Sequence, residues 1–193
     1  MTAMSAADAK TSVSCQYSEE ERSLLLALAH RVIGAALAGG EVDTAAPTEH
    51  LAQLRGAFTT LHLAGQLRGC VGFVAPIYPL YRTVAETALA AAFHDARFSP
   101  VTSEEAPRLT VEISVLSPLF PIAAEEVEVG KHGLVVSMAG RRGLLLPQVP
   151  AEHGWDRLTF LGQTCLKAGL PPDAWKMGAA IEAFVAEVFG EKP

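Results

Sequence analysis

The sequence predicts an α+β fold built on antiparallel β-sheet with packed helices. Residues 57–63 and 66–74 are rich in β-branched and aromatic types, and only Ala64-Gly65 separates them, which is typical of a β-hairpin. Residues 109–116 alternate apolar and polar side chains, as a strand with one buried face does. Helical segments do not alternate with strands as βαβ units, and no glycine-rich phosphate-binding turn follows a strand, so a parallel sheet is not favoured.

Size and composition exclude several classes of protein. A chain of 193 residues with 50% hydrophobic content can bury one core or the cores of two small lobes. The formal net charge of -6 argues against nucleic acid as the primary partner. Three cysteines without zinc-ligand spacing favour a reduced, cytoplasmic protein with no metal site. The apolar runs are far shorter than a bilayer span, so no membrane segment is expected.

The N-terminal half begins with a leader and two helices. Residues 1–17 are small and polar without a continuous apolar core, which predicts a disordered leader. Ser18 and Glu21 have the spacing of a capping box, and the apolar periodicity that follows predicts a helix ending at Gly39-Gly40. After Pro79, an alanine-rich segment with helical spacing runs to Phe93-His94 and is expected to pack closely against another element.

The C-terminal half is expected to contain short strands and one helix. Trp155 to Ala168 has helical spacing, with Leu158, Leu161 and Cys165 on one face, so Cys165 is expected in the core. Residues 181–189 fit either a helix or an edge strand, and periodicity alone leaves both open. Three strands are expected, at 127–129, 133–138 and 143–149, with residues 139–142 as the turn between the last two.

Cys70 is the candidate centre of any chemistry. On a period of two, Arg68, Cys70 and Gly72 share one strand face, where the Arg68 guanidinium would stabilise a thiolate. Gly69 and Gly72 leave room for a ligand, so Arg68 and both glycines are candidate ligand-binding residues around a candidate nucleophile. The alternative is that Cys70 is a small buried hydrophobe and that the glycines permit a bulge or tight packing.

A cysteine nucleophile needs a base, and several histidines are available. His132, framed by glycines at a strand start, is a candidate catalytic residue, as is Asp95 at a helix end; a structural or solvated role is the alternative for the histidine. Arg97 either pairs with Asp95 or binds an anionic ligand. The other histidines with polar neighbours are His62, His94 and His153.

Several motifs in order resemble those of one family. Leu67-Arg68-Gly69-Cys70-Val71-Gly72 resembles the Leu-Arg-Gly-Cys-Ile-Gly hexapeptide of the AMMECR domain family, and Asp95-Ala96-Arg97-Phe98-Ser99-Pro100 resembles its Asp-Pro-Arg-Phe-x-Pro turn. Val71 and Ala96 are the departures within these two motifs. The resemblance covers residues 18–191 as one AMMECR-type domain. Further matches are Glu112-Ile113-Ser114-Val115-Leu116, Gly130-Lys131-His132-Gly133, Leu146-Pro147-Gln148-Val149, Gly154-Trp155-Asp156 and Lys167-Ala168-Gly169-Leu170.

The resemblance implies a fold in two unequal lobes with a strand at the C-terminal piece. Prokaryotic members are similar to protein A of AmmeMemoRadiSam systems, which implies two partners: a Memo-type protein, itself similar to iron-dependent extradiol dioxygenases, and a radical S-adenosylmethionine (SAM) enzyme. The resemblance gives no catalytic residue to carry over to this chain, and the cofactor is left unknown. Two hypotheses follow. In one, Cys70 meets substrate in a cleft between the lobes with Arg68 orienting an anionic group. In the other, the chain is a non-catalytic binding or scaffold module whose hexapeptide is structural.

Overall fold

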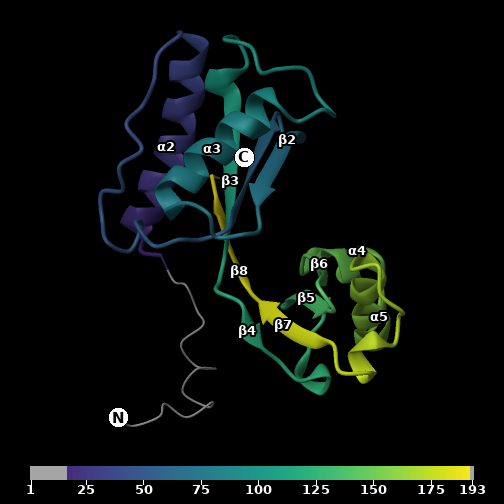
Figure 1. Ribbon diagram of the computed structural model, residues 1–193. Helices are drawn as coiled ribbons and strands as arrows, with labels where there is room; N and C mark the ends of the chain where they lie inside the picture. The colour runs from purple at the N-terminus through teal and green to yellow at the C-terminus, as the bar shows by residue number, and fades with distance from the viewer. Residues whose placement is uncertain (1–16, 192–193) are drawn as a thin grey trace, which may run out of the picture. The chain divides into compact units, whose positions relative to one another are not determined.

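The computed structural model describes residues 17–191, which form two compact units of α+β architecture. The first and larger unit comprises residues 17–116 together with the C-terminal residues from 187, and the second comprises residues 117–186 (Figure 1). Apart from Tyr17, which is buried, the predicted leader lies outside the described residues. The α+β prediction is confirmed.

Helix α2 (Glu19–Leu37) begins at the predicted capping box. The Ser18 hydroxyl accepts a hydrogen bond from the Glu21 N–H at 3.1 Å, and the Glu21 carboxylate accepts one from the Ser18 N–H at 3.1 Å. The helix ends ahead of Gly39, whose φ of 74° suits glycine. Its buried face consists of Leu25, Leu28, Ala29, Val32 and Ile33.

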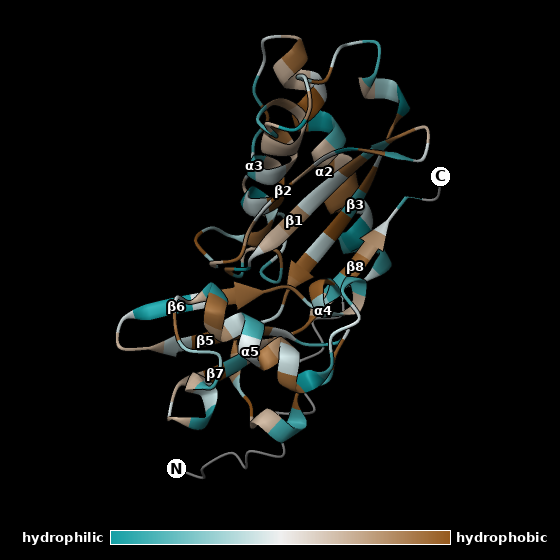
Figure 2. Cartoon of the chain, turned by 90° about the vertical axis from the view of Figure 1, so that its right-hand side faces the viewer, coloured by the Kyte–Doolittle hydropathy of each residue, from teal (hydrophilic) through white to brown (hydrophobic). Residues whose placement is uncertain are grey.

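The first unit contains a four-stranded sheet covered on one face by helices. Its strand order is β2-β1-β3-β8, with β1 (Ala57–Leu63) paired antiparallel to both β2 (Gln66–Phe73) and β3 (Leu109–Leu116). The turn residues Ala64 and Gly65 both have positive φ, so the predicted hairpin closes with a two-residue turn. Helices α2 and α3 (Leu80–Phe93) lie behind the strands in Figure 2, and their buried residues share one core with β1 and β3.

The last strand, β8 (Ala186–Gly190), is at the edge of this sheet and is fastened to α2 by carboxylates. Glu187 accepts hydrogen bonds from the Tyr17 N–H at 3.2 Å and from the Arg22 guanidinium at 2.7 Å. Glu191 lies 3.0 Å from His30 Nε2 and accepts the Val111 N–H at 2.8 Å. The C-terminal residues are therefore an integral part of the first unit.

The second unit is a smaller antiparallel sheet packed against α5 (Arg157–Lys167). Its strand order is β4-β7-β5-β6, and its core includes Phe160, Leu161 and Leu134. Cys165 is buried in a neighbouring cluster, as predicted, and burial raises the pKa of its thiol. The remaining elements are β4 (Phe120–Pro121), β5 (Gly133–Met138), β6 (Arg141–Leu145), α4 (Gln148–Glu152) and β7 (Ala180–Phe184).

Three sequence predictions in the C-terminal half need correction, and one open choice is settled. Residues 127–129 are not a strand, and the strand expected at 143–149 lies at 141–145 and is followed by α4. The reason is that Ala139 and Gly140 both adopt positive φ and make a two-residue turn, so that Arg141 and Arg142 already belong to the ladder. The open choice at residues 181–189 is settled as two strands. Leu158, expected on the buried face of the helix, is 55% exposed.

Candidate functional site

Cys70 lies on β2, the edge strand of the first sheet, directly opposite Thr60 of β1. Its side chain is half-buried, and its Sγ accepts a hydrogen bond from Thr60 Oγ1 at 3.3 Å. Its main-chain N–H and C=O both bond to residues of the loop after α3, on the free side of β2. Thr60 and Cys70 therefore form a non-hydrogen-bonded pair, the arrangement in which facing side chains come closest.

Asp95 and Arg97 bond the backbone of Cys70 on the free edge of β2. Asp95 Oδ2 accepts the Cys70 N–H at 2.9 Å, and Arg97 Nη2 donates to the Cys70 carbonyl at 3.3 Å. The Arg97 guanidinium also grips both carboxylate oxygens of Asp95, at 3.0 and 2.7 Å. These Arg97 hydrogen bonds, with help from the Cys70 N–H, hold the pKa of Asp95 far below its ordinary value. The pairing expected between the two residues is thus present, and it acts on the backbone of Cys70.

Arg68 ties the same loop to the strand two residues earlier. Its Nε and Nη2 bond the two oxygens of Glu105 at 3.0 and 2.9 Å, a bidentate pair. Its Nη1 and Nη2 also donate to the carbonyls of Ser99 at 2.9 Å and Pro100 at 3.3 Å. Arg68, followed by the Thr102 N–H, lowers the pKa of Glu105 to about 2. Most donors of this guanidinium are therefore engaged within the unit.

The strict alternation expected along β2 is interrupted at Arg68. Gly69 is the partner of Leu61, but the next residue of β1, His62, is opposite Leu67, so Arg68 is the extra residue of a β-bulge. Leu67 consequently shares the face of Thr60 and Cys70, and it is 42% exposed. The sequence left two interpretations open: glycines that make room for a ligand, or glycines that permit a bulge or tight packing. The backbone of this stretch has the bulge of the second interpretation.

Both glycines of the hexapeptide are required by packing. A Cβ on Gly69 would overlap the carbonyl oxygen of Ala91, because α3 lies directly against this part of β2. A Cβ on Gly72 would overlap the ring of Phe58, its cross-strand partner. The space that these glycines leave is filled by the protein itself.

His132 belongs to the second unit, where it has a structural environment. It is 6% exposed, its Nδ1 accepts the Glu128 N–H at 3.1 Å, and its ring contacts Phe120 edge-on. Burial lowers its pKa, which favours the neutral imidazole that this hydrogen bond needs. His153 stacks on Trp155 in the same unit. Within residues 17–191, no histidine is hydrogen-bonded to Cys70, and no cluster of His, Cys, Asp and Glu is placed to bind a metal.

Two contacts of this site escaped sequence reasoning. Glu105 lies 37 positions from Arg68, and its only local signal is the Thr102-x-x-Glu105 spacing, in which each residue accepts the other's N–H. Thr60 lies opposite Cys70 because the bulge shifts the register of the hairpin by one residue.

No helix in the described part of the chain is long and apolar enough to cross a membrane.

The fold and the site together define a class: a two-unit α+β protein whose first unit has an Arg-Gly-Cys edge strand bound to an Asp-x-Arg turn. The family model AMMECR1 matches residues 26–189. Protein MK0488 of Methanopyrus kandleri is 42% identical over 185 residues, covering 90% of this chain and 89% of that protein. Protein MJ0810 of Methanocaldococcus jannaschii is 42% identical over 182 residues, covering 89% and 90%.

A solved structure agrees with these relatives. The crystal structure of the uncharacterized protein PH0010 from Pyrococcus horikoshii is similar to this chain with a TM-score of 0.70 and 42% identity, covering 87% of this chain and 90% of that one. This chain belongs to the AMMECR1 family, as its motifs indicated.

Proposed function

We propose that this protein is a cytosolic component of a Memo- and radical-SAM-linked system, and that it acts there as a non-catalytic binding module. The observation that carries the binding role is that the charged groups around Cys70 are bonded to other groups of the same unit. Arg68 is engaged by Glu105 and two carbonyls, and Asp95 is engaged by Arg97 and the Cys70 N–H. Charged groups that are already bonded within the unit hold a loop in place, and they have few bonds left to offer a substrate.

This arrangement leaves a defined surface for a partner. The loop from Asp95 to Glu105 is fixed along β2, where an open strand edge would otherwise present unpaired N–H and C=O groups. The exposed side chain of Leu67 and the largely exposed guanidinium of Arg97 lie on or beside this strand. We call Leu67 and Arg97 the β2-edge patch, and in this proposal it contacts the Memo-type protein or the radical SAM enzyme.

A second candidate function, a reactive or ligand-binding Cys70, is favoured by one specific contact. The Thr60 hydroxyl donates to Sγ of a half-exposed thiol, and a donor in that position stabilises negative charge on sulfur. In that case the base would come from the ligand or the partner, because the described histidines make no hydrogen bond to this thiol.

Affinity measurements with the two partner proteins of the same organism separate the candidates. For the binding module, Cys70→Ser leaves the dissociation constant unchanged, whereas Leu67→Glu, which places a charge in the β2-edge patch, weakens binding about tenfold or more. Leu158→Glu, at an exposed leucine of the second unit, is the matched control. Failure of the wild-type protein to bind either partner would refute the proposal.

Thiol alkylation tests the second candidate. The rate at Cys70 is measured against pH by peptide mass spectrometry, with buried Cys165 as an internal reference that should react only on unfolding. A Cys70 that reacts faster than a free model thiol, combined with loss of partner binding in Cys70→Ser, would favour the reactive-thiol function over the binding module.

A further inference from the structure

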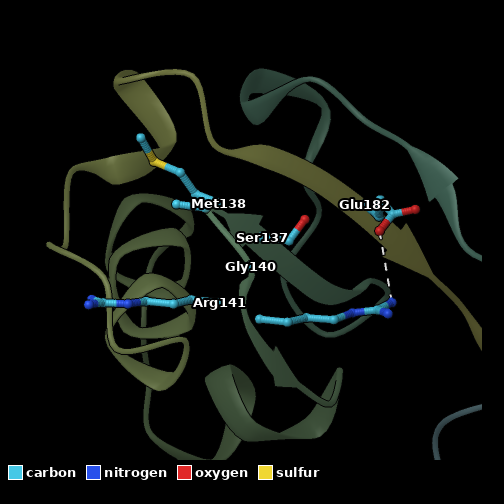
Figure 3. Close-up of a pocket in the computed structure, with 7 residues that line it drawn as sticks. Ser137, Met138, Gly140, Arg141 and Glu182 are labelled. Carbon is cyan, nitrogen blue, oxygen red and sulfur yellow. Dashed lines mark ion pairs between the residues drawn. The ribbon is translucent and has the colours of Figure 1, made fainter.

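A hollow at the tip of the β5–β6 hairpin in the second unit bears charged groups on its walls. It has a volume of about 450 Å³ and is lined by residues 137–142 and Glu182 (Figure 3). This volume is within the range of small-molecule sites in proteins. The hollow has no part in the function proposed above.

Three polar side chains of this hollow come from three adjacent strands. Ser137 of β5 is opposite Arg142 of β6, and Val135, two residues before Ser137, is opposite Glu182 of β7. Residues that are opposite or two apart share a sheet face, so Ser137, Arg142 and Glu182 lie on the same face. Arg142 and Glu182 thus meet across the central strand, as the dashed line in Figure 3 shows.

These three groups are available to a ligand. The Arg142 Nη2 to Glu182 Oε2 distance is 3.9 Å, too long for a hydrogen bond, and the arginine side chain is 59% exposed. Such a pair contributes little to stability, so opening it is not costly. Within residues 17–191, the Ser137 hydroxyl has no hydrogen-bond partner. Arg141, by contrast, is held by the Gly169 carbonyl at 2.7 Å.

We propose that this hollow binds a small zwitterion that carries a carboxylate and an ammonium group close together, such as a free α-amino acid. The Arg142 fork binds the carboxylate through two parallel hydrogen bonds, and Glu182 accepts from the ammonium group. Ser137 donates to the carboxylate. The ligand thus replaces the long contact between Arg142 and Glu182 with a short, charge-assisted contact to each of the two side chains.

Charge balance selects a zwitterion over simpler ions. A plain anion meets the Glu182 carboxylate, and a plain cation meets the Arg142 guanidinium, so each is attracted by one group and repelled by the other. A ligand with both charges leaves neither side chain unpaired. Acetate and methylamine, which represent the two halves of glycine, therefore measure whether both charges are needed.

Calorimetric titration of the full chain with glycine, L-alanine, L-serine, L-glutamate, acetate and methylamine tests the proposal. We expect at least one amino acid to bind with a dissociation constant below about 10 mM. Acetate and methylamine should each bind at least about tenfold more weakly. Arg142→Gln and Glu182→Gln should each lower the amino-acid affinity about tenfold or more, and Arg142→Lys should lower it less than Arg142→Gln.

Arg108→Gln is the matched control, because Arg108 is an exposed arginine of the first unit and its loss changes the net charge equally. Melting curves establish that each variant is folded, and Ser137→Ala supplies a milder change in the same hollow. The proposal is overturned if no amino acid in the panel binds, if acetate binds as tightly as glycine, or if Arg142→Gln binds like Arg108→Gln.

Discussion

Replacing Arg68 with methionine is the sharpest test of the structural role assigned to the hexapeptide. The substitution keeps the length of the aliphatic stem and removes the guanidinium that bonds Glu105, Ser99 and Pro100. The Arg68 and Glu105 side chains are only 11% and 24% exposed. Glu105 would keep the Thr102 N–H but lose the counter-ion that Arg68 provides.

The expected loss of stability follows from this burial. Removing one partner of a fully buried ion pair costs roughly 3–5 kcal/mol. Because Glu105 remains about a quarter open to water, we expect about 2–3 kcal/mol for Arg68→Met. In a protein of this size, that corresponds to a melting temperature lower by roughly 5–10 °C. Arg68→Lys keeps the charge without the bidentate geometry and should lose about half as much.

Urea unfolding followed by circular dichroism, with Arg82→Met as a control, measures this difference. Arg82 pairs with Glu86 on the surface of α3 at 3.3 Å, and its guanidinium also lies over the Tyr78 ring. Both charged side chains are nearly half exposed, so its loss should cost about 1 kcal/mol or less. A double-mutant cycle with Glu105→Gln should give a coupling energy of about 1–3 kcal/mol. If Arg68→Met costs no more than Arg82→Met, the bonds to the loop do not stabilise the unit and the reasoning is wrong.

Three further predictions concern pH and packing. Glu105 has a folded pKa of about 2 against an ordinary value of 4.5, so the stability it contributes is complete above pH 4.5 and is lost as the pH falls toward 2; Glu105→Gln should flatten the unfolding free energy in this window. The lowered pKa of His132 likewise means that stability declines as the pH falls below 6.5, and His132→Asn, which keeps an acceptor for the Glu128 N–H without titrating, should remove this slope in thermal melts between pH 7 and 5. Gly69→Ala should cost at least about 2 kcal/mol in urea unfolding because its methyl group overlaps the Ala91 carbonyl, whereas Gly34→Ala, in open space on α2, should stabilise by about 0.5–1 kcal/mol; equal effects would contradict the packing argument.

Much of the fold could be predicted because its signals are local. The Ser18–Glu21 capping box, the Ala64-Gly65 turn and the alternation of residues 109–116 each depend on neighbours within a few positions. Residues 181–189 carry no such local preference. They form two strands because each finds a partner distant in sequence, which periodicity does not record.

The candidate site was predictable only in part, for the same reason. The pairing of Asp95 with Arg97 spans two positions and was expected, but the bond from Asp95 to the Cys70 backbone joins residues 25 positions apart. The bulge at Arg68 depends on how β2 meets both β1 and the loop, so a strict period of two placed Leu67 on the wrong face. His132, a candidate because of its residue type and its place between glycines at a strand start, belongs to the other unit.

Glu187 and Glu191 fasten the C-terminal strand β8 to earlier residues of the first unit, and the order of synthesis therefore matters for this chain. The first unit begins at the N-terminal side of the sequence, yet its sheet lacks an edge strand until residues after 186 have left the ribosome. The second unit, complete at residue 186, has all its strands before then. Because the last strand of the second unit, β7, ends two residues before β8 begins, neither unit has all its strands until residues 180–190 have emerged, and until then the backbone of β3 is unpaired on the side that β8 will occupy.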